Sequence, residues 1–571
     1  MKSSKEKIMP SSFKKGKLHL FKQYAPTIIA ALLLAFVLYE ISFYIFKTYR
    51  AYFNSDAAIA NILAEEIVLA GSFFPGHWWY VNNDLWVFYK QALVIPWVLL
   101  GKNGYFAHAF TVFIVSIFMV VFIYNFFRAL MLSRAAALMG GVVVCIGYSP
   151  MYLRELYGEA AYTWYFIFMI AFLYMFRKLS PHVIRKSTKI KAFFLFLILL
   201  YLLVLANPLR FLVYYVAPFF GALALMVYFA RDSVKTFYEA VMKLLSIKKV
   251  IIFICAACVI SLATVAHYSL LESLHFSGGA NNATLIPLEE LPVHMAHAFL
   301  GLIHFIGAEW NDGIPVSSFA GVIALAKFFL YPMVLLFPAL HVKKYFYQMS
   351  SSERLTVLFS YVGFSIIMLL YATASLHEHA WAARNNIRYI SPFLMMILLC
   401  NVIMWRFFPA FTKLILAFCL MMALGSSWNY VSPKEWRGIV DERVALVEEL
   451  KNHDLHFGYA TYWDSHVYTV FSDGEVDIRP IKFTDEGLSA ETWLSSDGWY
   501  QKDSTPGKVF FLANGDDIDN FYNGMKKMNM PDPIEQFTSG NYTIIVFEKN
   551  PLYVKKTKAV PRKKKRIIMA P

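Results

Sequence analysis

The chain has 571 residues, of which 58% are hydrophobic, 18% aromatic and only 16% charged. A soluble protein of this length needs far more polar surface, so the composition excludes a water-soluble class. Several apolar stretches approach or exceed 18 residues and lack the alternation of barrel strands, which predicts a polytopic helical membrane bundle. The net charge of +15 therefore indicates membrane orientation rather than nucleic-acid binding.

The first segment, residues 1–24, is basic and runs into a full-length apolar stretch without a small-residue cleavage site. We expect a retained cytoplasmic tail rather than a signal peptide. About eleven spans are predicted from apolar runs of helical length. They lie near 25–47, 104–127, 135–153, 157–176, 192–207, 211–230, 250–270, 317–340, 355–374, 387–405 and 411–428.

Loop charges predict the orientation of these spans. The loops at 177–191 and 231–249 are rich in Lys and Arg, whereas 271–316 contains neither. Because positive loops stay in the cytoplasm, the N-terminus is predicted inside and 271–316 outside. The first loop, 48–103, and everything after about Trp428 then lie outside as well.

After the last span the composition becomes soluble, and 430–552 is predicted to be a small extracytoplasmic α/β domain. Pro433–Asn452 has the spacing of an amphipathic helix, and Asp516–Met528 a second helix. Ser472-Asp473-Gly474 is predicted as a hairpin turn, and 553–571 as a basic disordered tail. Strands are predicted at Phe457–Tyr462, Val467–Phe471, Val476–Ile481, Lys508–Leu512 and Tyr542–Phe547.

The first outer loop has a distinctive layout. Asn54-Ser55-Asp56 follows the first span directly, and 57–70 has the pattern of an interfacial helix. An aromatic, turn-rich stretch at 71–84 leads to a second apolar helix at 85–100, interrupted by Pro96. The order is therefore span, acidic residue, interfacial helix, loop, interfacial helix, span.

This layout resembles the GT-C superfamily of integral-membrane glycosyltransferases, which includes aminoarabinose transferases, protein mannosyltransferases and oligosaccharyltransferases. The stretches Gly458–Trp463 and Ser472–Gly474 are similar to the outer domains of bacterial relatives. The resemblance implies a GT-C-like fold and a sugar donor linked to a polyprenyl phosphate or pyrophosphate. Protein mannosyltransferases carry an adjacent Asp-Glu pair in this loop, but Ala57 follows Asp56, which argues against that subfamily.

Asp56 occupies the position of the superfamily's first-loop carboxylate. Sugar transfer needs a base that takes the proton from an acceptor hydroxyl, and Asp56 is our candidate. The alternative role is that Asp56 only caps the helix at 57–70, which Asp does well.

Two arginines at outer span ends are candidates for the donor phosphate. Arg210 follows Asn207-Pro208, and Arg388-Tyr389 with Pro392 is similar to an Arg-Tyr…Pro element near a late span of the superfamily. The guanidinium fork matches phosphate geometry, although interfacial snorkelling would also explain both residues.

Four further polar residues complete the predicted substrate-binding set. Glu155 and Glu159 correspond to the additional acid that many superfamily members carry after the third span, although a surface pair with Arg154 explains them equally well. His77 and Asp84 lie in the aromatic stretch of the first loop, where Asp84 also suits a turn or cap. Trp493, Trp499 and the aromatics of 73–89 are predicted to stack on sugar rings, with an interfacial aromatic belt as the alternative for the latter.

No metal site is predicted. His294 and His297 can share a helical face, and His377-Glu378-His379 is another conceivable set, but neither matches a metal motif. The resemblance still allows a divalent metal ion near the donor phosphate.

The sequence thus predicts a membrane glycosyltransferase, GT-C-like and inverting, of the bacterial inner membrane with its site facing the periplasm. Its partners would be a polyprenyl-phosphate-linked sugar donor, the bilayer, and an acceptor glycan such as lipopolysaccharide or O-antigen. The alternative is a transporter or flippase for a lipid-linked or small solute, which would require ionisable residues deep in several spans and internal repeats. A non-catalytic membrane scaffold is a third hypothesis.

Overall fold

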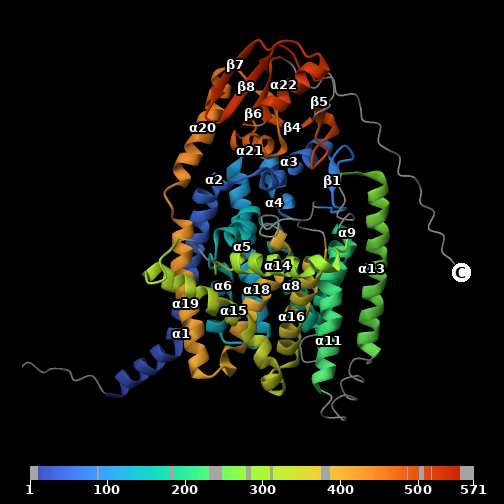
Figure 1. The fold of residues 1–571 in the computed structure, drawn as a ribbon. Coiled ribbons are helices and arrows are strands. Elements are labelled where there is room, and N and C mark those ends of the chain that lie inside the picture. Colours follow the sequence, from blue (N-terminus) through green and yellow to red (C-terminus); the bar gives the residue numbers. More distant parts are fainter. Residues whose placement is uncertain are drawn as a thin grey trace, which may run out of the picture.

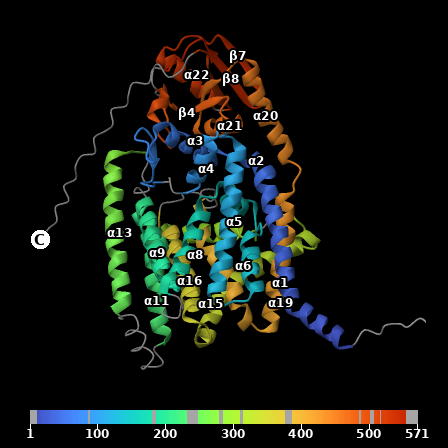
Figure 2. The ribbon, with the colours of Figure 1, turned by 180° about the vertical axis from the view of Figure 1, so that it is seen from behind.

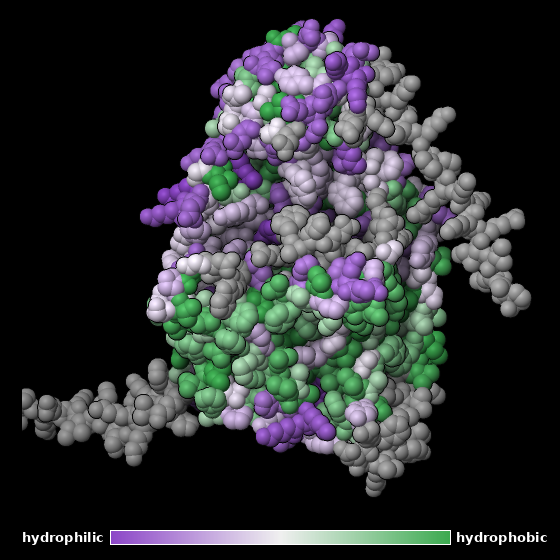
Figure 3. Space-filling model, viewed as in Figure 1, coloured by the Kyte–Doolittle hydropathy of each residue, from purple (hydrophilic) through white to green (hydrophobic). Residues whose placement is uncertain are grey.

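The computed structural model describes residues 11–85, 89–179, 186–230, 247–277, 284–308, 313–374, 386–484, 487–500, 507–515 and 517–552. Long helices lie side by side in one part, and a sheet domain covers one end of them (Figure 1). The surface of the helical part is a broad hydrophobic belt, whereas the sheet domain is mostly hydrophilic (Figure 3). The chain is a multi-pass integral membrane protein.

Nine helical segments among the described residues are long and apolar enough to cross a membrane. The most peripheral is α13 (Ile247–Ser273), which stands at the edge of the bundle in both ribbon views (Figures 1 and 2). The nine are Gln23–Tyr52, with most of α1 (Ser11–Phe43) and α2 (Tyr49–Tyr52); Tyr105–Ala129 (α5); Lys189–Ala206 in α9 (Lys186–Ala206); Pro208–Ala230, with α10 (Pro208–Phe211) and α11 (Ala217–Ala230); Val250–Ser273 in α13; Phe319–Gln348, with α15 (Phe319–Tyr345); Ser351–Thr373 (α16); Ile387–Phe407, with α18 (Ser391–Met404); and Ala410–Asn452, with α19 (Ala410–Val431) and α20 (Trp436–Asn452).

In the part of the chain that the structure describes, the count is nine spans rather than the predicted eleven, or ten if one bent pair forms a single span. In that pair α6 (Arg134–Cys145) and Pro150–Glu159, which begins with α7 (Pro150–Leu153), meet at 107°. Pro150 disfavours helical backbone at the preceding residue, and Ser149 is extended. The span predicted at 157–176 is α8 (Ala161–Lys178), which is absent from the nine because its tyrosines and terminal basic pair reduce its hydropathy.

The first loop folds back over the bundle. α3 (Ser55–Ala70) and α4 (Lys90–Leu99) correspond to the two predicted interfacial helices, and they pack against each other. The cap of α3 is Asn54, whose side chain accepts a hydrogen bond from the Ala57 N–H, so the alternative role of Asp56 as the cap is wrong. Between the helices β1 (Trp79–Val81) pairs in parallel with β2 (His275–Ser277), a contact that the sequence did not predict.

The C-terminal domain contains a six-stranded sheet in the order β5-β4-β3-β6-β8-β7. The central strand β3 pairs in parallel with β4 and β6, and the remaining pairs are antiparallel. The predicted helices correspond to α20 and α22 (Asp517–Met528). The strands are β3 (Phe457–Ala460), β4 (Asp477–Thr484), β5 (Gly487–Ala490), β6 (Val509–Asn514), β7 (Glu535–Ser539) and β8 (Tyr542–Phe547).

Two local predictions in this domain are wrong. Val467–Phe471 belongs to α21 (Tyr462–Phe471) rather than to a strand, because this segment packs against α3. Ser472–Gly474 ends that helix before β4 and is therefore not a hairpin turn. Asp473 and Gly474 have φ values of 56° and 83°, the left-handed backbone that terminates helices.

Polar contacts fasten the domain to the first loop. Trp499 Nε1 donates to Glu66 at 2.7 Å, and the Trp79 N–H donates to the Ser495 carbonyl at 2.7 Å. Arg443 Nη1 donates to the carbonyl that precedes Asn54, at 2.8 Å. α21 packs on α3 (Figure 1). Its first residues contact the start of α3, where Ser55 Oγ donates to the Trp463 carbonyl at 3.2 Å and the Tyr462 hydroxyl donates to Asp56 at 2.8 Å.

Candidate active site

A cavity of about 90 Å³ lies where the first loop, the bundle and the C-terminal domain meet. It collects residues that are hundreds of positions apart in the sequence. The charged residues on its wall are Asp56, Lys90, Glu159, Arg210 and Arg388. Its other lining residues include Asn82, Tyr89, Gln91, Tyr162, Tyr389, Trp493 and Leu494.

Asp56 is held in the first turn of α3 and faces this cavity. Its Oδ1 accepts a hydrogen bond of 2.8 Å from the Tyr462 hydroxyl, and its Oδ2 lies 3.9 Å from Arg388 Nη1. The side chain is 26% exposed, so a substrate can reach it. Burial raises the pKa of the Asp56 carboxyl, the charge of Glu159 adds to the rise, and Arg388 and the Tyr462 hydrogen bond oppose it.

Arg388 lies between two carboxylates at the start of the span that contains α18. Its Nη1 is 3.7 Å from Glu159 Oε2 as well as 3.9 Å from Asp56. Its Nε is buried and has no hydrogen-bond partner among the described residues. Glu159 is itself oriented by Asn54, whose Nδ2 donates to it at 3.0 Å. The guanidinium is therefore positioned while part of its donor capacity is unused.

Lys90 is a site residue that the sequence analysis missed. It is the first residue of α4, and its buried Nζ donates to the carbonyls of Glu159 at 2.5 Å and Ala57 at 3.3 Å. Burial lowers the pKa of Lys90 to about 8, although the charges of Glu159 and Asp56 favour the protonated form. The sequence feature that could have identified Lys90 is its position as a lone lysine at the start of α4, an otherwise apolar interfacial helix.

Arg210 and Asp84 are brought together as an ion pair. Arg210 Nη2 lies 3.0 Å from Asp84 Oδ2, and Nη1 donates to the Tyr165 hydroxyl at 3.1 Å. Asp84 is fully buried, which raises its pKa although Arg210 opposes the rise, and it does not line the cavity. Arg210 thus reaches the cavity with its charge already compensated, in contrast to Lys90.

Two further predicted residues lie beside the cavity. Glu155 is fully buried and accepts from Arg154 Nη2 at 2.9 Å, so the expected Arg154 pair exists but is not a surface pair. Tyr389 lines the cavity with its ring edge-on to Tyr162, and its carbonyl accepts from Tyr214 at 2.7 Å.

His77 lies apart from the cavity wall. Its Nε2 is 2.6 Å from Glu66 Oε2, the carboxylate that also binds Trp499. Trp499 is 7% exposed and packs under Arg479, so its predicted role in stacking on sugars is wrong. Trp493, by contrast, lines the cavity.

Three solved structures that resemble this chain were found, and one of them supports this architecture. ArnT from Cupriavidus metallidurans bound to undecaprenyl phosphate matches with a TM-score of 0.51 and 9% identity, over 92% of this chain and 98% of that one. The chain has a GT-C-like fold. The apo state of the same ArnT matches with a TM-score of 0.49 and 10% identity over 91% and 97% of the chains. The apo oligosaccharyltransferase of Archaeoglobus fulgidus matches with 0.42 and 12% identity over 86% and 70%.

The fold assignment depends on the first of these matches. No family model matches the chain, and no curated protein matches its sequence.

Within the described part of the chain, no group of three or more His, Cys, Asp or Glu could hold a metal ion. Arg388 Nη1 lies 3.9 Å from Asp56 Oδ2 and 3.7 Å from Glu159 Oε2, so a guanidinium already faces both carboxylates. Of the predicted alternatives, His294 lies 3.8 Å from Glu290, and 377–379 is outside the described residues.

Proposed function

We propose that this protein is an inverting membrane glycosyltransferase that transfers a sugar from a polyprenyl-phosphate-linked donor to an extracytoplasmic glycan. The observation that carries the proposal is that one cavity brings together a partly exposed carboxylate, a partly exposed guanidinium and a buried lysine. Asp56 is 26% exposed, and Arg388 and Lys90 line the same wall. The GT-C-like fold supports the reaction class, and the ArnT structure bound to undecaprenyl phosphate supports the donor class.

In the proposed reaction Asp56 accepts the proton of an acceptor hydroxyl as that oxygen attacks the anomeric carbon. The bond from this carbon to the donor phosphate oxygen breaks, and the electron pair leaves with the polyprenyl phosphate. Attack opposite the leaving group inverts the anomeric configuration. The raised pKa of Asp56 makes it a stronger base than an exposed carboxylate, which favours proton transfer near neutral pH.

Cations on the cavity wall would stabilise the departing phosphate. Lys90 donates hydrogen bonds to two backbone carbonyls rather than to a carboxylate. Its ammonium group can therefore form an ion pair with the phosphate of a ligand. Arg388 has a buried Nε without a partner in the described part of the chain, and a phosphate oxygen would satisfy it. Arg210, which Asp84 already pairs, is assigned a supporting role at the same wall.

Three acids would position neighbouring cations rather than exchange protons. The Glu159 carboxylate faces Arg388, and the Glu159 backbone carbonyl accepts a hydrogen bond from Lys90. Glu155 pairs with Arg154, and Asp84 pairs with Arg210. Tyr389 and Trp493 supply aromatic walls for a sugar ring. His77, which binds Glu66, would act at most at the outer edge of the acceptor path.

We also propose the cellular arrangement. Residues 1–24 would form a cytoplasmic tail, 25–429 the transmembrane catalytic part, 430–552 the extracytoplasmic domain and 553–571 a basic tail, in a bacterial inner membrane. The positive loops support this orientation, with the cavity facing the periplasm. The donor would enter from the bilayer, and a glycan such as lipopolysaccharide or O-antigen would approach beneath the C-terminal domain. Family analogy supports that acceptor class.

The test uses full-length protein in membranes with extracted polyprenyl-linked sugars and envelope glycans. Wild type is expected to transfer labelled sugar, and Asp56→Asn to lose transfer while membrane level and folding are kept. Asp519→Asn, an exposed acid on α22, is the control and is expected to behave as wild type. Movement of the lipid-linked sugar across the bilayer without any transferred sugar would favour the transporter hypothesis instead.

A further inference from the structure

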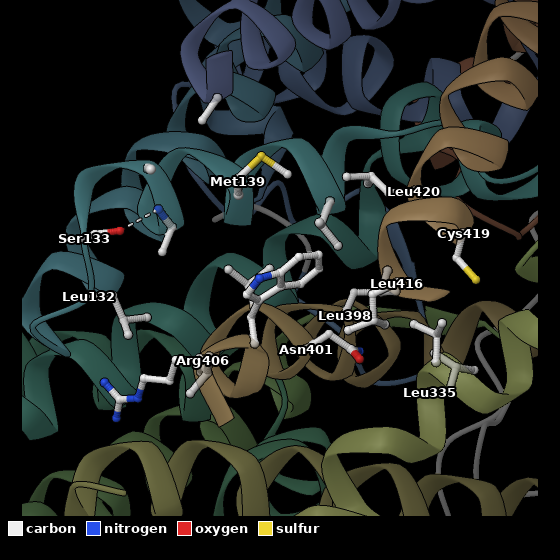
Figure 4. A pocket seen from close by; sticks show the side chains of 18 of the residues that line it. Leu132, Ser133, Met139, Leu335, Leu398, Asn401, Arg406, Leu416, Cys419 and Leu420 are labelled. Carbon is white, nitrogen blue, oxygen red and sulfur yellow. Dashed lines mark hydrogen bonds between the residues drawn. The ribbon is translucent and has the colours of Figure 1, made fainter. Parts of the chain in front are cut away.

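The helical bundle encloses a second and larger cavity of about 710 Å³. Its wall is formed by α1, α6, α15, α18 and α19, and almost all of its side chains are apolar. Figure 4 shows it with Leu132 and Arg406 on one side, Leu335 and Cys419 on the other, and Leu398 between them. No residue lines both this cavity and the one that contains Asp56.

The cavity is elongated and opens away from the candidate active site. Its wall follows α18 and the short turn after it, from Leu394 to Arg406, which is about 18 Å at the rise of an α-helix. Arg388 is at the other end of the same span. Trp405 is 38% exposed and Met131 is 83% exposed, so the Arg406 end reaches the molecular surface. The length corresponds to one leaflet, which is about 15 Å of a hydrocarbon core of about 30 Å.

Positive charge surrounds this mouth. The two connections that border it, 128–136 and 405–413, contain Arg128, Arg134, Arg406 and Lys413 but no Asp or Glu. Arg134 is exposed at the first turn of α6, whose Ser133 cap lines the cavity. Glu353 compensates only Arg406, through a contact of 2.8 Å. An apolar slot of leaflet depth is therefore combined with a cationic rim.

We propose that this cavity binds an acyl chain of an anionic phospholipid from the leaflet beside the N-terminal segment, with the lipid phosphate at the cationic rim. Pro26 and Ile29 of α1 lie on the cavity wall, which places the opening on the N-terminal side. The donor chain is a poorer occupant, because the donor phosphate would lie at the opposite end of α18. The bound lipid would fill a void between α1 and α18 that otherwise lacks packing contacts.

The test is native mass spectrometry of the full-length protein, delipidated in detergent and titrated with phosphatidylglycerol or phosphatidylcholine. Wild type is expected to retain one phosphatidylglycerol with at least about tenfold preference over phosphatidylcholine. Leu398→Trp on α18 and Leu420→Trp on α19 fill the cavity from different walls and should each weaken binding by at least about tenfold. Leu369→Trp, on an exposed face of α16, is the matched control and should bind as wild type.

Arg134→Gln separates headgroup from chain recognition. It should reduce the preference for phosphatidylglycerol and leave phosphatidylcholine binding unchanged. Equal binding of the two lipids by wild type, or unaltered binding by folded Trp variants, would overturn the proposal. Displacement of the lipid by undecaprenyl phosphate would also overturn it and would assign the cavity to a polyprenyl chain. The wild-type titration and the competition need no variant, so a folding defect cannot obscure them.

Discussion

Tyr462 connects the C-terminal domain to the proposed base, and its hydroxyl is the clearest place to perturb Asp56 without touching it. Tyr462→Phe removes the 2.8 Å hydrogen bond and keeps the ring that packs against Trp463 and His466. Hydrogen bonds to charged groups contribute about 1.5–3 kcal/mol. Because Asp56 is partly exposed, we expect the lower end of that range, which equals about a tenfold change in the ionisation equilibrium of the Asp56 carboxyl.

The direction of the change in the Asp56 pKa depends on which protonation state of the carboxyl the Tyr462 hydrogen bond favours. Tyr462 stabilises the ionised carboxylate, so its loss raises the pKa of Asp56 further above the ordinary value. The base is active when deprotonated. Transfer should therefore fall by about tenfold on the acidic side of the profile and recover as the pH rises.

The assay is the pH dependence of kcat/KM for sugar transfer by the purified protein. The matched control is Tyr542→Phe, because Tyr542 donates a hydrogen bond of the same 2.8 Å length to Asp464 in the same domain. Tyr542→Phe should leave the acidic side of the kcat/KM profile at the same pH as in wild type. An unshifted limb in folded Tyr462→Phe, or an equal shift in the control, would refute the reasoning.

Three further predictions concern the same cavity and its support. Lys90→Gln should weaken donor binding by about 10- to 100-fold in a lipid-donor titration, since it removes a buried charged donor, and unchanged affinity would contradict the assignment. The wild-type kcat/KM profile should rise with pH as Asp56 ionises and fall above about 8 as Lys90 loses its proton, and Lys90→Arg should remove that upper limb. Asn54→Ala should destabilise the protein by about 1 kcal/mol through loss of the α3 cap; an unaltered thermal unfolding midpoint would contradict this.

The sequence predicted what depends on local pattern. The first-loop helix, the acidic residue before it and the Arg-Tyr element all lie in short segments whose spacing and charge can be interpreted directly. The structure places Arg388 within 4 Å of both Asp56 and Glu159, which the separate motifs could not establish.

The remaining features depend on contacts between distant segments. Tyr462 lies 406 positions from Asp56, and no local pattern connects the two. The pairing of Arg210 with Asp84 likewise needs the fold. β-branched and aromatic residues in 467–471 favour a strand locally, but burial of this segment against α3 stabilises a helix instead.

The most direct test of the central claim separates binding from chemistry at Asp56. Donor affinity and single-turnover transfer would be measured on the same preparations of wild type and Asp56→Asn, which retains the shape and loses the basic oxygen. We expect the donor affinity of Asp56→Asn to stay within a few-fold of wild type and its turnover to be lower by at least about 100-fold, within the range for loss of a general base. Turnover near that of wild type in a folded Asp56→Asn protein would contradict it.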